Sequence, residues 1–173
     1  MVACSVVYLA VSIAVICYWV WATGCDPSDP TVAAQREAEA KGEMFDTRKF
    51  EYMCEVCRAH VLSDSKHCGS CNRCVDTFDH HCRWINNCVG KSNYMLFFKL
   101  ICLTVLQTFM HLVTSIVNVV LMMAGHKQTL NQVKLVFGVS QLGFSIALLV
   151  ACFFNLLAVL FLGHLVHFHI KLQ

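Results

Sequence analysis

The chain has 173 residues, enough for one domain or two small ones. Hydrophobic residues make up 57% of it and charged residues only 14%, which is far from the average of soluble globular proteins. The formal net charge of +2 is not gathered into a basic stripe with interleaved aromatic residues, so we expect no nucleic-acid partner.

Three uncharged runs predict transmembrane helices, because about 20 apolar residues cross a bilayer as a helix. The first occupies residues 1–24 and lacks the positively charged start of a secretory signal. Tyr18, Trp19 and Trp21 near its end match the aromatic belt of a membrane interface. A chain that starts directly inside such a helix is expected to be a fragment or a short isoform.

Residues 25–50 predict a cytosolic linker that contains one short helix. A turn cluster covers Asp26–Pro30, in which Asp29 is expected to cap the helix and Pro30 to be its first residue. The helix is predicted over Thr31–Glu43, ending near Gly42. Its Ala- and Glu-rich composition favours a plain solvated face over a binding site for a partner.

Residues 51–94 carry most of the chemistry, and the 35 residues from Cys54 to Cys88 contain seven cysteines and four histidines. The segment shows no sustained helix or strand period and is too short to bury a stable apolar core, which indicates that metal holds it. Two Cys-x2-Cys units, Cys54/Cys57 and Cys68/Cys71, beside histidines favour zinc in a reducing compartment over disulfides. Eleven candidate ligands are available for the eight positions of two tetrahedral sites. Spacing alone does not identify the three side chains that would not bind metal.

The run Asp79-His80-His81-Cys82 allows two interpretations. In one, an orienting carboxylate, a base and a nucleophile follow one another, and the nearby imidazole raises the thiolate fraction of Cys82. In the other, Cys82 is a further zinc ligand and Asp79 orients His81. Spacing leaves both interpretations open.

The rest of the chain predicts two more membrane spans. Residues 95–124 form the second, 125–132 a luminal loop and 133–168 the third, with 169–173 returning to the cytosol. Nine of the thirteen Lys and Arg residues lie between the first two helices, so the positive-inside rule puts that segment in the cytosol. Within the second span, His111 and Asn118 are expected to form hydrogen bonds between helices.

The cysteine-rich segment resembles a known family over its whole length. The matching pattern is Cys54-x2-Cys57-x9-His67-Cys68-x2-Cys71-x2-Cys74, followed by Asp79-His80-His81-Cys82, Cys88, Asn93 and Phe97. It is similar to the cysteine-rich domain of DHHC protein S-acyltransferases. The resemblance implies an integral-membrane α-helical fold, with a cytosolic zinc-stabilised domain between the first and second of three visible transmembrane helices. Family members typically have four or more spans, so the chain is expected to be truncated at both ends.

The resemblance also implies roles for individual residues. Cys82 would be the nucleophile, His80 its base and Asp79 the group that orients His80. The nearby cations Arg83, Lys91 and Lys99 could meet the phosphates of CoA, although ordinary positive-inside charge accounts for them as well. Two structural zinc ions would be bound, one by Cys54, Cys57, His67 and Cys74 and the other by Cys68, Cys71, His81 and Cys88.

The function that the resemblance implies is transfer of a fatty acyl group, palmitoyl above all, from acyl-CoA to protein cysteines through an S-acyl intermediate on Cys82. Its partners would be acyl-CoA, membrane-associated protein substrates and the lipid bilayer, in the endoplasmic reticulum or Golgi. The alternative is a catalytically impaired form that acts as a zinc-dependent membrane adaptor or regulator.

Overall fold

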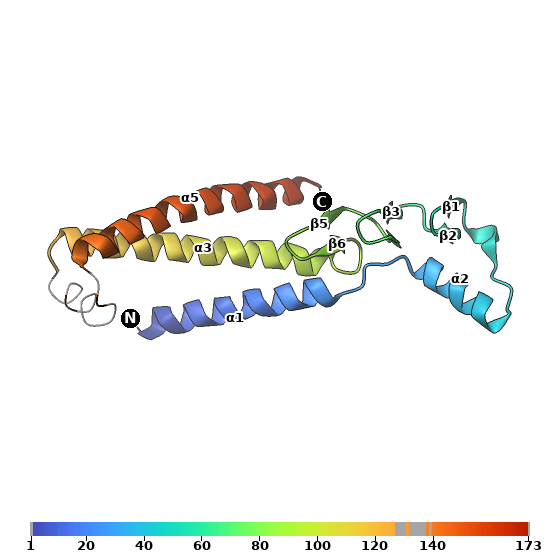
Figure 1. The fold of residues 1–173 in the computed structure, drawn as a ribbon, viewed down its shortest axis with the longest axis horizontal. Coiled ribbons are helices and arrows are strands. Elements are labelled where there is room, and N and C mark those ends of the chain that lie inside the picture. The colour runs from blue at the N-terminus through green and yellow to red at the C-terminus, as the bar shows by residue number, and fades with distance from the viewer. Residues whose placement is uncertain (1, 127–130, 132–137, 139, 173) are drawn as a thin grey trace. The chain divides into compact units, whose positions relative to one another are not determined.

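The structure is a computed structural model that describes residues 2–126, 131, 138 and 140–172 (Figure 1). Three long helices, α1 (Val2–Gly24), α3 (Tyr94–Met123) and α5 (Gln141–Leu172), account for most of the described chain. Between α1 and α3 lie α2 (Pro30–Lys41), a 3-10 turn η1 (Thr47–Lys49) and three short hairpins. The hairpins pair β1 (Tyr52–Cys54) with β2 (Ala59–Val61), β3 (Lys66–Cys68) with β4 (Arg73–Val75), and β5 (His80–Cys82) with β6 (Asn87–Val89).

The three long helices are apolar enough to cross a membrane, over Ser5–Gly24, Tyr94–Met123 and Gln141–Lys171. They confirm the predicted class, three spanning helices with a cysteine-rich region between the first and second. The expected loop at 125–132 and the expected start of the third span at residue 133 fall largely outside the described residues. At its other end α5 continues to Leu172, past the predicted end at residue 168, because neither Gly nor Pro interrupts it there.

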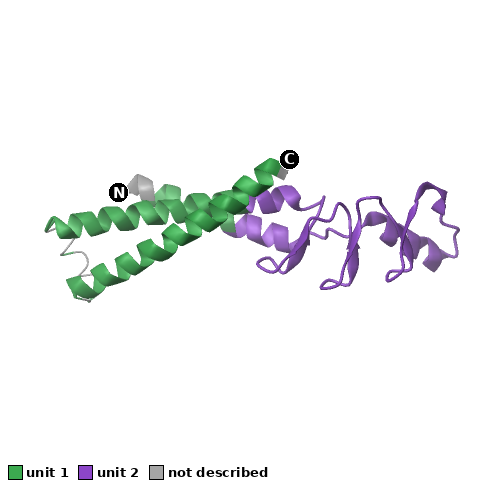
Figure 2. Ribbon diagram, turned by 90° about the horizontal axis from the view of Figure 1, so that it is seen from above, with its two compact units in different colours: residues 1–15, 101–173 green, residues 16–100 purple. Residues whose placement is uncertain are grey.

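The chain divides into two compact units (Figure 2). One consists of residues 1–15 and 101–173, and in it α1 and α3 meet through polar side chains. The Gln107 amide donates to the Ser12 hydroxyl at 2.9 Å and to the Tyr8 hydroxyl at 3.3 Å, and Tyr8 also bonds His111. The helix–helix role expected of His111 is therefore confirmed, whereas Asn118 donates to the carbonyl of Thr114 in its own helix.

The other unit, residues 16–100, contains the short helix α2 between α1 and the hairpins. The predicted cap is confirmed, because the Asp29 carboxylate accepts from the Thr31 amide at 2.7 Å and Pro30 is the first helical residue. The helix ends at Lys41 and is capped by Gly42, whose φ of +70° is the left-handed conformation that glycine adopts without strain.

The prediction that α2 has a plain solvated face is only partly correct, because one side of the helix is packed. Val32 is buried with Ala59, Val61 and Cys74 in a small cluster beneath the first hairpin. The Gln35 side chain pairs with both backbone groups of His60, accepting at 2.9 Å and donating at 2.6 Å. One apolar residue and one amide give too weak a periodic signal to reveal this packed face from the sequence.

The third hairpin is tied to the end of α1 by the Asn87 side chain. Its Nδ2 donates to the carbonyls of Ala22, Thr23 and Cys25 at 3.2, 3.2 and 2.7 Å. These carbonyls lie at the helix C-terminus, where no intrahelical donor remains. Asn93, which is fully buried, adds a longer bond of 3.4 Å to the Ala22 carbonyl. Asn87, which the sequence did not single out, therefore fixes the hairpin against the C-terminal end of α1.

Replacing Asn87 with Ala should lower the free energy of unfolding by about 1–3 kcal/mol, because buried carbonyls lose their donor. A thiol-reactive dye that reports exposure of buried cysteines on heating would measure the change in detergent. Asn86→Gly is the matched control, since Asn86 is exposed and its φ of 47° suits glycine. Equal midpoints for Asn87→Ala and the wild type would contradict the role given to Asn87.

Candidate metal centres and reactive thiol

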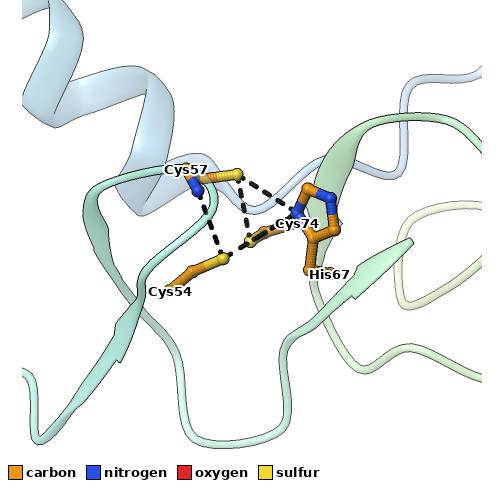
Figure 3. A group of neighbouring side chains, drawn as sticks. All are labelled: Cys54, Cys57, His67 and Cys74. Atoms are coloured by element: carbon orange, nitrogen blue, oxygen red, sulfur yellow. Dashed lines mark hydrogen bonds between the residues drawn. The ribbon is translucent and has the colours of Figure 1, made fainter. Parts of the chain in front are cut away.

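The first group of metal-ligating side chains joins the first and second hairpins. Cys54 and Cys57 come from the first, and His67 and Cys74 are directly paired across the second. The Nδ1 atom of His67 lies 3.4, 3.8 and 3.9 Å from the sulfur atoms of Cys57, Cys54 and Cys74 (Figure 3). All four donor atoms lie within 4.8 Å of one another, so the group could hold one metal ion.

The second group repeats this arrangement one hairpin further along the chain. Cys68 and Cys71 come from the second hairpin, and His81 and Cys88 are directly paired across the third. The sulfur atoms of Cys71 and Cys88 are 3.3 Å apart, and His81 Nδ1 lies 3.3 and 3.7 Å from them. The second hairpin therefore contributes ligands to both groups.

The donor sets fit zinc in size and in chemistry. A tetrahedral ion with Zn–S bonds of about 2.3 Å places neighbouring donors about 3.5–3.8 Å apart, close to the observed 3.3–3.9 Å. Burial and then the neighbouring sulfur atoms raise the pKa values of Cys74 and Cys88. Sulfur atoms crowded in this way are stabilised as thiolates by a cation between them. All cysteines whose side chains the structure describes are free thiols, so no disulfide competes for these ligands.

The alternation of side chains along a strand explains how adjacent residues serve different sites. On β3, His67 belongs to the first group and Cys68 to the second, because successive residues of a strand point to opposite faces. On β5, His81 belongs to the second group, so its neighbours His80 and Cys82 point away from that group. In the described part of the chain, Cys82 is in neither ligand group.

The residues predicted as catalytic are joined by hydrogen bonds, with His80 and Cys82 on the face of β5 opposite the second ligand group. The Asp79 carboxylate accepts from His80 Nδ1 at 2.6 Å, and a side-chain hydrogen bond links His80 to Cys82. Burial by itself would raise the pKa of Cys82, but hydrogen bonds from His80 and from the amides of Ile85 and Trp84 hold it below the usual range. The bonds with Cys82 and Asp79 raise the pKa of His80, although burial opposes them. The geometry brings together an orienting carboxylate, an imidazole and a thiol that is 5% exposed.

The same face of the third hairpin meets the membrane helix. Cys82 pairs directly with Asn87, whose side chain binds the end of α1. Directly paired residues of an antiparallel hairpin point to the same face. Phe97 of α3, which is buried, lies edge-on to the His80 ring with centroids 5.3 Å apart. The thiol therefore faces apolar helix ends, and His81 on the opposite face of the strand points to the metal group.

The three cations predicted to meet CoA have different surroundings. Lys91 Nζ lies 3.6 Å from a carboxylate oxygen of Asp76, and Lys99 Nζ lies 5.8 Å from the centre of the Tyr18 ring. Arg83 is exposed in the turn of the third hairpin. The proposed contact of these residues with CoA stays a prediction.

An internal repeat, which we did not expect from the sequence, underlies all three hairpins. The first cysteines, Cys54, Cys68 and Cys82, recur every 14 residues, and each pairs across its hairpin in the same register. Residues with positive φ, Arg58, Asn72 and Asn86, recur at the same spacing. The signal was present in the sequence, but the third unit lacks the second cysteine and so does not stand out as a Cys-x2-Cys motif.

Comparison with known proteins agrees with this architecture. A family model described as DHHC palmitoyltransferase matches residues 47–173. Over 95 residues, 55% of this chain, the sequence is 36% identical to a protein of Arabidopsis thaliana named "Probable protein S-acyltransferase 20". It is 58% identical over 45 residues, 26% of the chain, to palmitoyltransferase SWF1 of Saccharomyces cerevisiae. Each match covers 13% of the length of the relative, so the chain corresponds to a small part of these proteins.

Replacing one ligand of the shared hairpin should release metal. We expect two zinc ions per wild-type chain, and fewer in Cys68→Ala, with loss of folded structure because the binding energy of such sites is folding energy. Metal per chain, measured by mass spectrometry of the purified protein, checks this. The matched control is Cys82→Ser, which should keep both ions. One ion in the wild type, or a loss in the control, would contradict the assignment of ligands.

Proposed function

Because this chain belongs to the DHHC palmitoyltransferase family, we propose that it transfers a fatty acyl group from acyl-CoA to cysteine thiols of membrane-associated proteins. The observation that carries the proposal is the Asp79–His80–Cys82 chain of hydrogen bonds on the face of β5 opposite the metal group. The family description favours palmitoyl as the group transferred.

In the first half of the reaction, His80 accepts the proton of the Cys82 thiol. The sulfur attacks the carbonyl carbon of the acyl-CoA thioester, the bond from that carbon to the CoA sulfur breaks, and CoA leaves as a thiol after taking up the proton. Asp79 bonds His80 at Nδ1, which leaves the other ring nitrogen for Cys82. This orients the base and stabilises its protonated form.

In the second half, a cysteine of the protein substrate attacks the Cys82 thioester. The bond between the acyl carbon and the Cys82 sulfur breaks, His80 takes the proton of the incoming thiol, and that proton returns to Cys82. The enzyme is regenerated with no net change in its own groups, as two-step covalent catalysis requires.

The placement of the thiol suits a fatty substrate. Burial of each CH2 of an acyl chain contributes about 0.8 kcal/mol, so a long chain prefers an apolar environment while CoA stays in water. The hairpin that carries Cys82 is bound to the end of α1 through Asn87. Attachment to a membrane helix therefore keeps the thiol close to where the thioester of a membrane-bound donor would lie.

Zinc ions in the two ligand groups would hold the three hairpins together. The groups use none of the atoms assigned to the reaction, so the ions would support the position of His80 and Cys82 without contacting the substrate. We also propose that Arg83, Lys91 and Lys99 attract the phosphates of CoA, and that the protein works in the endoplasmic reticulum or Golgi with this domain in the cytosol.

Labelling with radioactive palmitoyl-CoA tests the intermediate. The wild-type chain in lipid nanodiscs should acquire label that hydroxylamine removes, because a thioester is cleaved by that nucleophile. Cys82→Ser should acquire none, and Cys102→Ser is the control thiol replacement. If the wild type and Cys82→Ser carry equal label, the enzymatic proposal fails and the adaptor function is favoured.

Removing the base separates catalysis from folding. His80→Ala should slow acylation by about 10²–10⁴-fold, the usual contribution of a general base, and leave metal content unchanged. His60→Ala is the matched control, because the contacts described for His60 use its backbone. Single-turnover kinetics with excess enzyme would measure the rate. An unchanged rate in His80→Ala would remove His80 from the mechanism.

A further inference from the structure

A metal knuckle is a hairpin that carries two cysteine ligands three residues apart. The third hairpin has this form but lacks the second ligand. In the first two hairpins, the residue three positions after the first cysteine is itself a cysteine, Cys57 or Cys71, and each belongs to a ligand group. In the third hairpin that position holds Ile85, which is 2% exposed. Otherwise the backbone is the same in all three units, in strand register and in the left-handed residue that follows.

The first cysteine also has the same place in each hairpin. Cys54, Cys68 and Cys82 each end the first strand of a hairpin and pair with the residue five positions further on, which is Ala59, Arg73 or Asn87. Cys82 therefore stands in its hairpin where a metal ligand stands in the other two.

While the domain binds its two structural ions, zinc can also bind a thiol that is placed in this way. A stable site needs three or four protein ligands, and a second sulfur at position 85 would complete a pair on the same hairpin. With His80 on the same face of β5, such a pair would offer three ligands. With Ile85 present, only Cys82 and His80 remain, which is too few for tight binding.

We propose that Ile85 is the residue that keeps metal away from Cys82. The side chain occupies the second ligand position of a third knuckle with an apolar group, so that the hairpin retains the knuckle backbone while its sulfur stays free to react. Ile85 is thus a positioning residue with a chemical purpose beyond packing. The proposal rests on the proposed function only in taking Cys82 as the reactive thiol.

Restoring the missing ligand tests this directly. The full chain carrying Ile85→Cys is purified beside the wild type and Ile85→Val, and each is titrated with cadmium, a thiophilic ion with thiolate charge-transfer absorption. We expect one additional ion in Ile85→Cys, relative to the other two proteins. Alkylation of Cys82 by iodoacetamide, followed by mass spectrometry, should be suppressed several-fold in the metal-loaded variant and recover when the added ion is removed.

The double variant Ile85→Cys/Cys82→Ser shows whether the additional ion uses Cys82, and it should return to the metal content of the wild type. The proposal is overturned if Ile85→Cys keeps its two structural ions and binds no more, or if the double variant still binds the additional ion. If Ile85→Cys loses structural ions, Ile85→His repeats the test with another ligand. Loss of structural ions in both variants assigns Ile85 to packing alone and also overturns the proposal. Metal content is read without acyl transfer, so an inactive chain would not affect the outcome.

Discussion

The fold of the cysteine-rich domain depends on one constraint, the sharing of the second hairpin between two metal-ligand groups. His67 and Cys74 complete a group with the first hairpin, and Cys68 and Cys71 start a group with the third. The apolar clusters beneath these hairpins are small and include the cysteines themselves. Because so little apolar surface is buried, metal coordination in the two groups would supply the free energy that holds the hairpins in series.

The same construction separates the sulfur atoms of the ligand groups from that of Cys82. Neighbouring residues of a strand face opposite ways, so a strand that turns His81 toward the second ligand group necessarily turns His80 and Cys82 away from it. The direct pairing of Cys82 with Asn87 then places the thiol on the face that binds the end of α1. One strand of three residues thus links the metal group on one side with the membrane helix on the other.

Much of this could be predicted from the sequence. Long uncharged runs are forced by the bilayer to be helices, so the spanning segments are visible without a structure. The cap formed by Asp29 and Pro30 depends only on residues that are neighbours in the chain, so it could be predicted correctly from the sequence. The packed face of α2 and the role of Asn87 were missed, because both depend on partners far away in the chain, His60 in one case and the carbonyls of α1 in the other.

By itself, then, the sequence determined the membrane class, the number of candidate ligands and the resemblance to the acyltransferase family, because these depend on composition and on spacing along the chain. Spacing left open which groups lie outside the metal-ligand sets, and the folded hairpins bring the two sets implied by the resemblance together in space without Cys82. Cys82 stands in the position that Cys54 and Cys68 occupy in their own hairpins, but it is not followed three residues later by a second cysteine as they are. What distinguishes Cys82 is the absence of a partner sulfur, since Ile85 fills that place, together with the alternation of β5 that turns the thiol away from the ligands of the neighbouring group.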